Sequence, residues 1–213
     1  MAHWETITTE RRAFADLLDT LTPEQWATQS LCEAWTVKGV VAHLVTPLTV
    51  TPAEMAMATL RERGAVPRVM TSLARPREAL PISELAALMR ERAGRRFAPP
   101  GLGSIAPLTD LLVHRLDVSI PLGLADERPQ EPWAPALDFL MSAKARVGFR
   151  SAPTPRLRYV ATDLDWAHGA GPVVEAPAAV LGLALLRRAP RLDDLGGPGA
   201  DELRAWALVG STA

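Results

Sequence analysis

Histidine is scarce in this chain, and the positions of the histidines indicate what chemistry the protein can do. The 213 residues include 4 histidines, which are His3, His43, His114 and His168. His114 follows Asp110 by four positions, so on a helix the two side chains lie one turn apart on one face. A carboxylate and an imidazole in that arrangement can bind one divalent ion, and His43 from a second helix would complete three protein ligands. Three ligands leave one coordination position for water or substrate, as in catalytic zinc sites.

Asp117 extends the same predicted helix face, three residues after His114. A carboxylate there can orient His114 through its second ring nitrogen, or it can act as a base. A simpler interpretation stays open, because an aspartate and a histidine four residues apart also form an ordinary helical ion pair. A single histidine on an apolar helix, such as His43, is also common in protein cores.

Other reactive side chains give weaker candidates. Cys32, the single cysteine, could act as a nucleophile, although a lone cysteine is more often inert packing. Residues 163–168, Asp-Leu-Asp-Trp-Ala-His, could bind a metal, but they are more simply the end of a strand that enters a turn. Nine arginines lie between Arg61 and Arg96, interspersed with glutamates. They predict a solvated face or, alternatively, a rim that attracts an anionic substrate.

Composition excludes several classes of protein. Hydrophobic residues make up 48% and charged residues 22%, which is typical of a globular protein. A formal charge of −1 argues against binding of nucleic acid through a field of the whole chain, and one cysteine excludes a disulfide framework or a cysteine-rich zinc site. The amino terminus shows no signal peptide, and the longest apolar run, 178–186, is too short to span a bilayer. We therefore expect a soluble, cytoplasmic protein with neither a membrane nor a nucleic-acid partner.

The helices that position these residues can be predicted from hydrophobic periodicity and from helix start signals. They predict helices over 4–20, after Thr22, after Thr36, from 83 onward, over 108–120 and over 133–147, which together form a bundle. Thr22, Pro23 and Gln25 predict a capped helix start, and Thr36 predicts another. The proline-rich stretch 64–81 is expected to be an irregular loop or short helical pieces.

The composition changes after Phe149, where residues 151–155 read as a linker. Alternating side chains predict a strand over 156–162, and Val173-Val174 is its expected hairpin partner. Helices are expected over 177–188 and 201–208. These patterns predict two parts: a helical bundle, 1–150, and a small α/β segment, 151–213, docked on it.

Three stretches resemble a known family. Residues 30–44, from Ser30 to Leu44, resemble the opening motif of mycothiol-dependent maleylpyruvate isomerase-like proteins, which belong to the DinB-like metal-binding four-helix bundles. Residues 112–123 resemble the second motif of that family, and residues 160–166 resemble its C-terminal segment. The resemblance implies a mainly α fold, a DinB-like four-helix bundle with a small C-terminal α/β appendage.

The resemblance also implies a divalent metal, usually zinc, bound by one histidine of the first motif and an acid-x-x-x-His pair of the second. On this chain these ligands fall on His43, Asp110 and His114. The family has glutamate where this chain has Asp110, which is one methylene shorter, so the ion must sit nearer the helix or be reached through water. The basic substrate-binding residue expected of a true isomerase has no clear counterpart in the short C-terminal segment.

Two hypotheses of function follow. The first is a metal-dependent transferase or isomerase that uses a low-molecular-weight thiol, such as mycothiol, as cosubstrate and acts on a small electrophile. In it Asp117 is the catalytic residue that orients His114 or acts as base, and Trp35 binds the cosubstrate. The second is a non-catalytic bundle that binds a metal, a small ligand or a partner protein. DNA binding is disfavoured by the charge and the lack of a recognition helix, and a homodimer is a candidate assembly.

Overall fold

The computed structural model describes residues 3–99, 101–125, 127–146, 148–149 and 152–209. The chain divides into two compact units, Met1–Asp126 and Glu127–Ala213. None of the helices in the described ranges is both long and apolar enough to cross a membrane.

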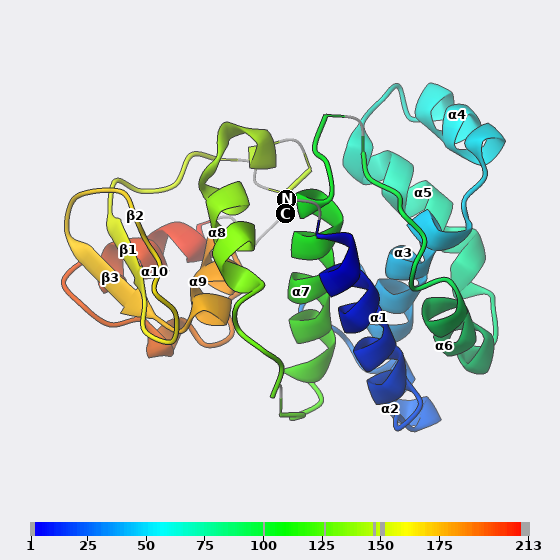
Figure 1. Ribbon diagram of the computed structural model, residues 1–213, viewed down its shortest axis with the longest axis horizontal. Helices are drawn as coiled ribbons and strands as arrows, with labels where there is room; N and C mark the ends of the chain where they lie inside the picture. The colour runs from blue at the N-terminus through cyan, green and yellow to red at the C-terminus, as the bar shows by residue number, and fades with distance from the viewer. Residues whose placement is uncertain (1–2, 100, 126, 147, 150–151, 210–213) are drawn as a thin grey trace. The chain divides into compact units, whose positions relative to one another are not determined.

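The first unit is helical (Figure 1). Its helices are α1 (Trp4–Leu18), α2 (Pro23–Ala27), α3 (Val37–Thr49), α4 (Pro52–Arg61), α5 (Val66–Glu78), α6 (Ile82–Glu91) and α7 (Ile105–Ser119). Helices α1 and α3 each pack against both α6 and α7, which makes these four helices a bundle. Its core is fully buried and contains Ile7, Phe14, Leu85, Met89 and Leu108. The predicted helical bundle is confirmed.

Two helix starts have the caps that the sequence predicts. Thr22 and Gln25 form a capping box, in which the Thr22 side chain accepts from the backbone of Gln25 and the Gln25 side chain accepts from the backbone of Thr22. The Thr36 hydroxyl accepts a hydrogen bond from the Gly39 N–H at 3.3 Å. These bonds satisfy backbone donors that have no partner within the helix. The second cap fixes the start of α3, the helix that carries His43.

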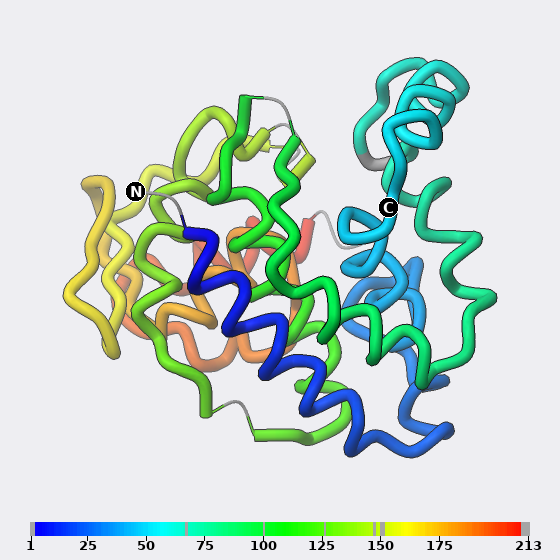
Figure 2. Tube along the Cα trace, turned by 45° about the vertical axis from the view of Figure 1, so that its right-hand side comes forward, coloured from blue at the N-terminus to red at the C-terminus, as the bar shows by residue number. Residues whose placement is uncertain are grey.

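The second unit combines helices with a small mixed sheet (Figure 1). Figure 2 follows the Cα trace of this unit through yellow and orange to red. Its elements are α8 (Trp133–Met141), η1 (Ala143–Arg146), β1 (Arg158–Ala161), β2 (Ala167–His168), β3 (Val173–Ala176), α9 (Ala178–Leu185), η2 (Leu192–Asp194) and α10 (Ala200–Leu208). The strand order is β2-β1-β3, and β3 packs against α9 and α10. The mainly α fold with a small α/β part is thereby confirmed.

The pairing of the strands corrects one prediction. The antiparallel partner of β1 is β2, with Tyr159 opposite His168, whereas β3 is parallel to β1, with Tyr159 opposite Val174. The expected hairpin of 156–162 with Val173-Val174 is therefore wrong. The chain reverses twice, first between β1 and β2 and again around Gly171, whose φ of 130° suits only glycine. The second reversal brings β3 to the other edge of β1.

The boundary between the two compact units falls between 126 and 127, whereas composition placed the division at 150/151. Helix α8 packs against α9 of the second unit, and the Trp166 Nε1–H donates to Asp138 of α8 at 2.9 Å. The proline-rich 151–155 stretch thus lies within the second unit.

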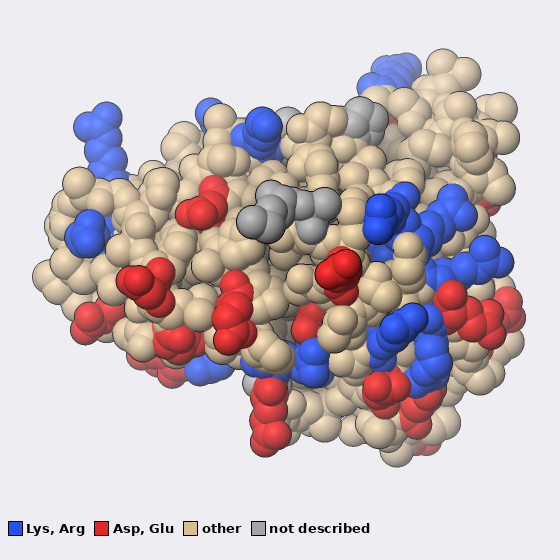
Figure 3. All heavy atoms as spheres, viewed as in Figure 1, with Lys and Arg blue, Asp and Glu red and all other residues tan. Residues whose placement is uncertain are grey.

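The arginines of the 61–96 segment are exposed, with one exception. Of its nine arginines, only Arg77 is buried. Side chains of both signs are interspersed over the face shown in Figure 3. The mixture of positive and negative side chains favours the solvated-face interpretation over a rim that attracts an anionic substrate.

Arg77 belongs to α5, a helix within the proline-rich 64–81 stretch. The 64–81 stretch, expected to be an irregular loop or short helical pieces, contains the single 13-residue helix α5. Its Val69 and Leu73 pack on Val50 and Ala58 in a small separate core. One proline of the helix, Pro67, falls in the first turn, where a missing N–H costs no intrahelical bond. Packing supplied by α4 therefore outweighs the weak helix propensity of the stretch.

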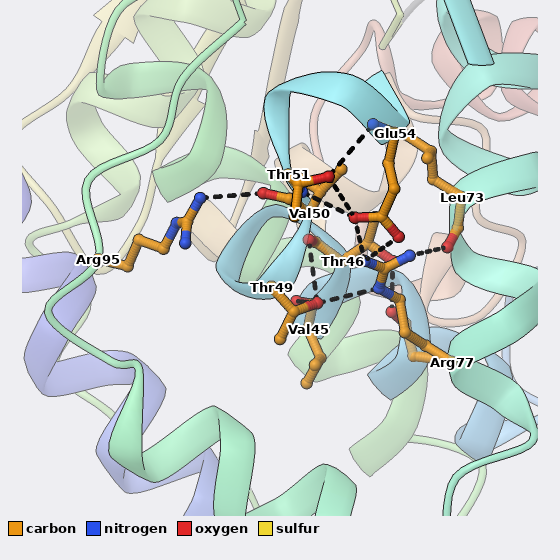
Figure 4. A network of polar contacts seen from close by, with 10 residues as sticks. Val45, Thr46, Thr49, Val50, Thr51, Glu54, Leu73, Arg77 and Arg95 are labelled. Atoms are coloured by element: carbon orange, nitrogen blue, oxygen red, sulfur yellow. Dashed lines mark hydrogen bonds and ion pairs between the residues drawn. The ribbon is translucent and has the colours of Figure 1, made fainter. Parts of the chain in front are cut away.

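A polar network joins α3, α4 and α5 (Figure 4). Arg77 donates to the Thr49 hydroxyl at 2.9 Å, to the Leu73 carbonyl at 2.9 Å and to the Glu54 carboxylate at 3.2 Å. Glu54 also accepts from the backbone N–H of Thr51, which caps α4. The one buried arginine of the segment is thus a structural tie between three helices.

Candidate metal centre

The three predicted metal ligands come together between two bundle helices. His43 lies on α3, while Asp110 and His114 lie one turn apart on α7, and these two helices pack against each other. The His43 Nε2 is 3.2 Å from one oxygen of Asp110, and the His114 Nε2 is 3.4 Å from the other. One ligand atom from each residue lies within 4.8 Å of the others. Across the described ranges this is the one group of three or more such residues close enough to hold a metal ion.

Burial within the group is uneven. His43 and His114 are each 7% exposed, whereas the Asp110 side chain is 28% exposed. Water or a small molecule therefore reaches the group at Asp110, while both imidazoles are shielded by protein.

Asp117 holds the far side of His114. Its carboxylate is fully buried and accepts a hydrogen bond from the His114 Nδ1 at 2.8 Å. With a proton fixed on Nδ1, Nε2 is the ring nitrogen of His114 that faces Asp110 and that would bind a metal after losing its own proton. A carboxylate behind a histidine ligand is a recurring feature of zinc sites, because it fixes the ring and its tautomer. The Asp117 carbonyl also accepts the Leu31 N–H at 3.1 Å, which anchors the 28–36 loop on α7.

Opposite charges dominate the electrostatics of the group. Burial alone would raise the pKa of Asp110, but the charges of His43 and His114, and hydrogen bonds from both, hold it well below its usual value. Burial alone would lower the pKa of His114, but Asp110 and Asp117 raise it to about 10. In the metal-free protein Asp110 is therefore ionised and His114 is protonated at neutral pH.

Trp35, the predicted cosubstrate-binding residue, lies directly against the group. Its ring stacks on His43 with a centroid distance of 4.7 Å and an interplanar angle of 27°. It also approaches His114 at 5.8 Å in a tilted arrangement. The loop that presents it carries Cys32, which is half-buried and whose backbone bonds to the Ser30 and Gln29 side chains.

Residues 163–168 have structural partners in the second unit. Asp163 accepts the Ala178 N–H at 2.8 Å and so satisfies a donor at the start of α9. His168 is exposed and stacks on Trp166 at 6.2 Å. These contacts favour the strand-and-turn interpretation of the segment.

Arg11 of α1 is a buried charged residue near the group that the sequence analysis did not identify. It is 4% exposed, and its guanidinium donates to the Ala93 and Arg95 carbonyls at 2.9 and 2.8 Å. Burial lowers the pKa of Arg11 to about 10, and the negative charge of Asp110 acts in the opposite direction. Its spacing from Ile7 and Phe14, four residues after one and three before the other, could have revealed this burial.

Comparisons with known proteins find one family match and two chains of similar fold. Residues 7–100 match the model of the mycothiol maleylpyruvate isomerase N-terminal domain family. The fold resembles the crystal structure of the mycothiol-dependent maleylpyruvate isomerase, with a TM-score of 0.57 and 16% identity over 92% of this chain and 93% of that chain. A histidine-to-alanine mutant of that isomerase gives a TM-score of 0.58 at 15% identity with the same coverage. No curated protein matches the sequence. At these identities the structural likeness concerns the fold alone.

Proposed function

Since residues 7–100 match the model of the mycothiol maleylpyruvate isomerase N-terminal domain family, we propose that this protein is a metal- and thiol-dependent transferase or isomerase. Its cosubstrate is a low-molecular-weight thiol such as mycothiol, and its substrate is a small electrophile. The partners in this proposal are small molecules, with neither a nucleic acid nor a membrane.

The observation that carries the proposal is the grouping of His43, Asp110 and His114 with ligand atoms within 4.8 Å of one another. Two imidazole nitrogens and one carboxylate oxygen are a donor set that suits zinc. The shorter Asp110 still reaches both histidines, at 3.2 and 3.4 Å, so the missing methylene does not take its carboxylate out of the group. The residues present therefore fit a divalent ion.

A zinc ion held there would lower the pKa of a coordinated thiol, so that a nucleophilic thiolate exists at neutral pH. The side chains prepare for this in distinct ways. His114 loses the proton on its Nε2, and Asp117 keeps the remaining proton on Nδ1. Because Asp117 is fully buried, it serves as a positioning residue for His114 rather than as a base that meets substrate. Trp35 covers His43, which leaves the more exposed Asp110 side for the approach of the thiol. The role of Trp35 in cosubstrate binding stays a prediction.

One observation favours the second candidate, a non-catalytic bundle. Asp110 lies within 3.4 Å of both histidines, and the attraction between its carboxylate and the two imidazoles needs no metal. In that case the three residues are a buried ion-pair network of a bundle that has kept the shape of the family without its chemistry.

Metal analysis separates the two candidates. We would measure metal content by mass spectrometry on tag-free protein, before and after chelation, and then titrate the cobalt-substituted protein with a thiol. The proposal predicts about one divalent ion per chain and a thiol-dependent change in the visible spectrum of cobalt. Protein that contains no metal and takes none up contradicts the proposal and leaves the ion-pair network. Metal binding without a spectral response to thiol supports the non-catalytic module.

A further inference from the structure

The two histidines of the candidate metal centre are held in different ways. His114 donates through Nδ1 to Asp117. His43 is as buried as His114, yet its Nδ1 has no hydrogen-bond partner among the described residues. A histidine ligand usually owes its orientation to such a bond. Another contact must therefore fix the ring of His43.

Trp35 is the side chain in position to do so. Its indole ring stacks on the His43 imidazole at 4.7 Å and 27°, which is the most nearly parallel ring contact of the group. His114 meets the same imidazole edge-on at 4.9 Å and 69°. The imidazole of His43 is thus covered on one face by an indole and also contacts the ring of the other histidine.

The loop around Trp35 is built to hold the indole still. The Trp35 carbonyl accepts hydrogen bonds from the Ser30 hydroxyl at 2.6 Å and from the Gln29 amide at 2.8 Å. The Leu31 N–H donates to the Asp117 carbonyl at 3.1 Å. Asp117 therefore supports His114 directly through its side chain. It supports His43 indirectly, because its carbonyl holds the loop that carries Trp35.

Glycine at position 39 makes the stacking sterically feasible. Gly39 lies one turn before His43 on α3, and a Cβ there would come within 2.9 Å of the Trp35 Cβ and 3.2 Å of its Cδ1. An alanine would push the indole away from α3. A helix-weakening residue at the start of α3 is thereby explained by the need to seat Trp35.

We propose that Trp35 is the positioning residue of the His43 ligand, with its indole face in place of the hydrogen bond that His43 lacks. This inference rests on the proposed metal site. When His43 binds a cation through Nε2, its ring becomes more positive, and the electron-rich face of an indole stabilises such a ring. The contact therefore stabilises the metal-bound form more than the metal-free form.

Zinc affinity, measured by competition with a chromophoric chelator, tests the proposal. Trp35→Leu and Gly39→Ala should each lower the association constant roughly tenfold, and Trp35→Phe should lower it less. The matched controls are Trp206→Phe, a half-buried tryptophan of the second unit, and Gly94→Ala, where a Cβ meets nothing within 4 Å. Both controls should bind zinc as the wild type does. Circular dichroism should show unchanged helix content in all variants.

Fluorinated tryptophans distinguish electronic stabilisation from simple packing. Fluorination weakens the negative face of the indole with little change of shape, so zinc affinity of the wild type should fall stepwise with the number of fluorines. The protein has 6 tryptophans, and the same labelling of Trp35→Phe is the control, in which affinity should not change.

The outcomes separate this inference from the proposed function. A wild-type protein that binds no zinc overturns the metal site itself. If the wild type binds zinc and the Trp35→Leu and Gly39→Ala variants bind it with the same affinity, the role of Trp35 is overturned and the metal site stands. Equal affinity across the fluorinated series also overturns the role as proposed.

Discussion

His114 uses both ring nitrogens, one toward Asp110 and one toward Asp117, so its removal should disable the site with little effect on the bundle. We expect His114→Ala to lose the bound metal completely while its circular dichroism stays that of the wild type, because most of the other buried residues of α7, such as Leu108, Leu112 and Val113, are apolar and keep their packing. The exposed His168 of the second unit provides the control, and His168→Ala should keep the metal. Stoichiometric zinc in His114→Ala would show that the ligand assignment is wrong.

The Asp117 side chain acts on the metal through His114. Asp117→Asn keeps the size of the side chain but removes the charge that holds the His114 proton on Nδ1, so zinc affinity should fall by about 10–100-fold. Chelator competition measures this, and the thiol-dependent spectrum of the cobalt protein should persist at saturating metal. Asp201→Asn, at a side chain that is 96% exposed, should leave affinity unchanged. Unchanged affinity in Asp117→Asn would contradict the positioning role.

The free energy of unfolding of the metal-free protein should depend on pH through His114. The pKa of His114 is raised to about 10 in the folded chain, above about 6.5 for an unfolded histidine. Its contribution to the free energy of unfolding is therefore full below pH 6.5 and is lost as the pH rises toward 10. Urea denaturation between pH 6 and 10 should show this decline, and His114→Ala should flatten it. An equal decline in both proteins would assign the effect to other groups.

At the scale of elements, features that depend on neighbours in the sequence could be predicted, and features that depend on packing against other elements could not. The caps at Thr22 and Thr36 were found because their hydrogen bonds reach only three residues along the chain. The spacing of Asp110 and His114 is equally local. Helix α5 was missed because Val50 and Ala58, which stabilise it, come from outside its own sequence. Likewise, no sequence period shows that the ring of Trp35 stacks on His43.

The α4–α5 hairpin is also stabilised by contacts between different helices, because Arg77 of α5 bonds to Thr49 of α3 and Glu54 of α4. Arg77→Met keeps much of the buried stem but removes the bonds to Thr49, Glu54 and Leu73. We expect the hairpin to be destabilised by about 1–3 kcal/mol. Hydrogen exchange should then become faster across 52–78 while α7 keeps its protection. Arg75→Met, at the exposed arginine one residue before Pro76, is the control. Equal acceleration in α7 would mean that the network supports the whole bundle instead.

At the scale of the whole molecule, every residue assigned to the metal centre belongs to the first compact unit. His43, Asp110 and His114, with Asp117 and Trp35 behind them, all precede residue 127, and the bundle has its own buried core. A chain ending at Asp126 should therefore fold into helices and bind zinc with an affinity close to that of the full protein. Circular dichroism and chelator competition measure both properties. A helical fragment without zinc affinity would show that the second unit contributes to metal binding. A fragment that binds zinc and thiol but does not convert an electrophile accepted by the full protein would instead assign substrate recognition to residues 127–213.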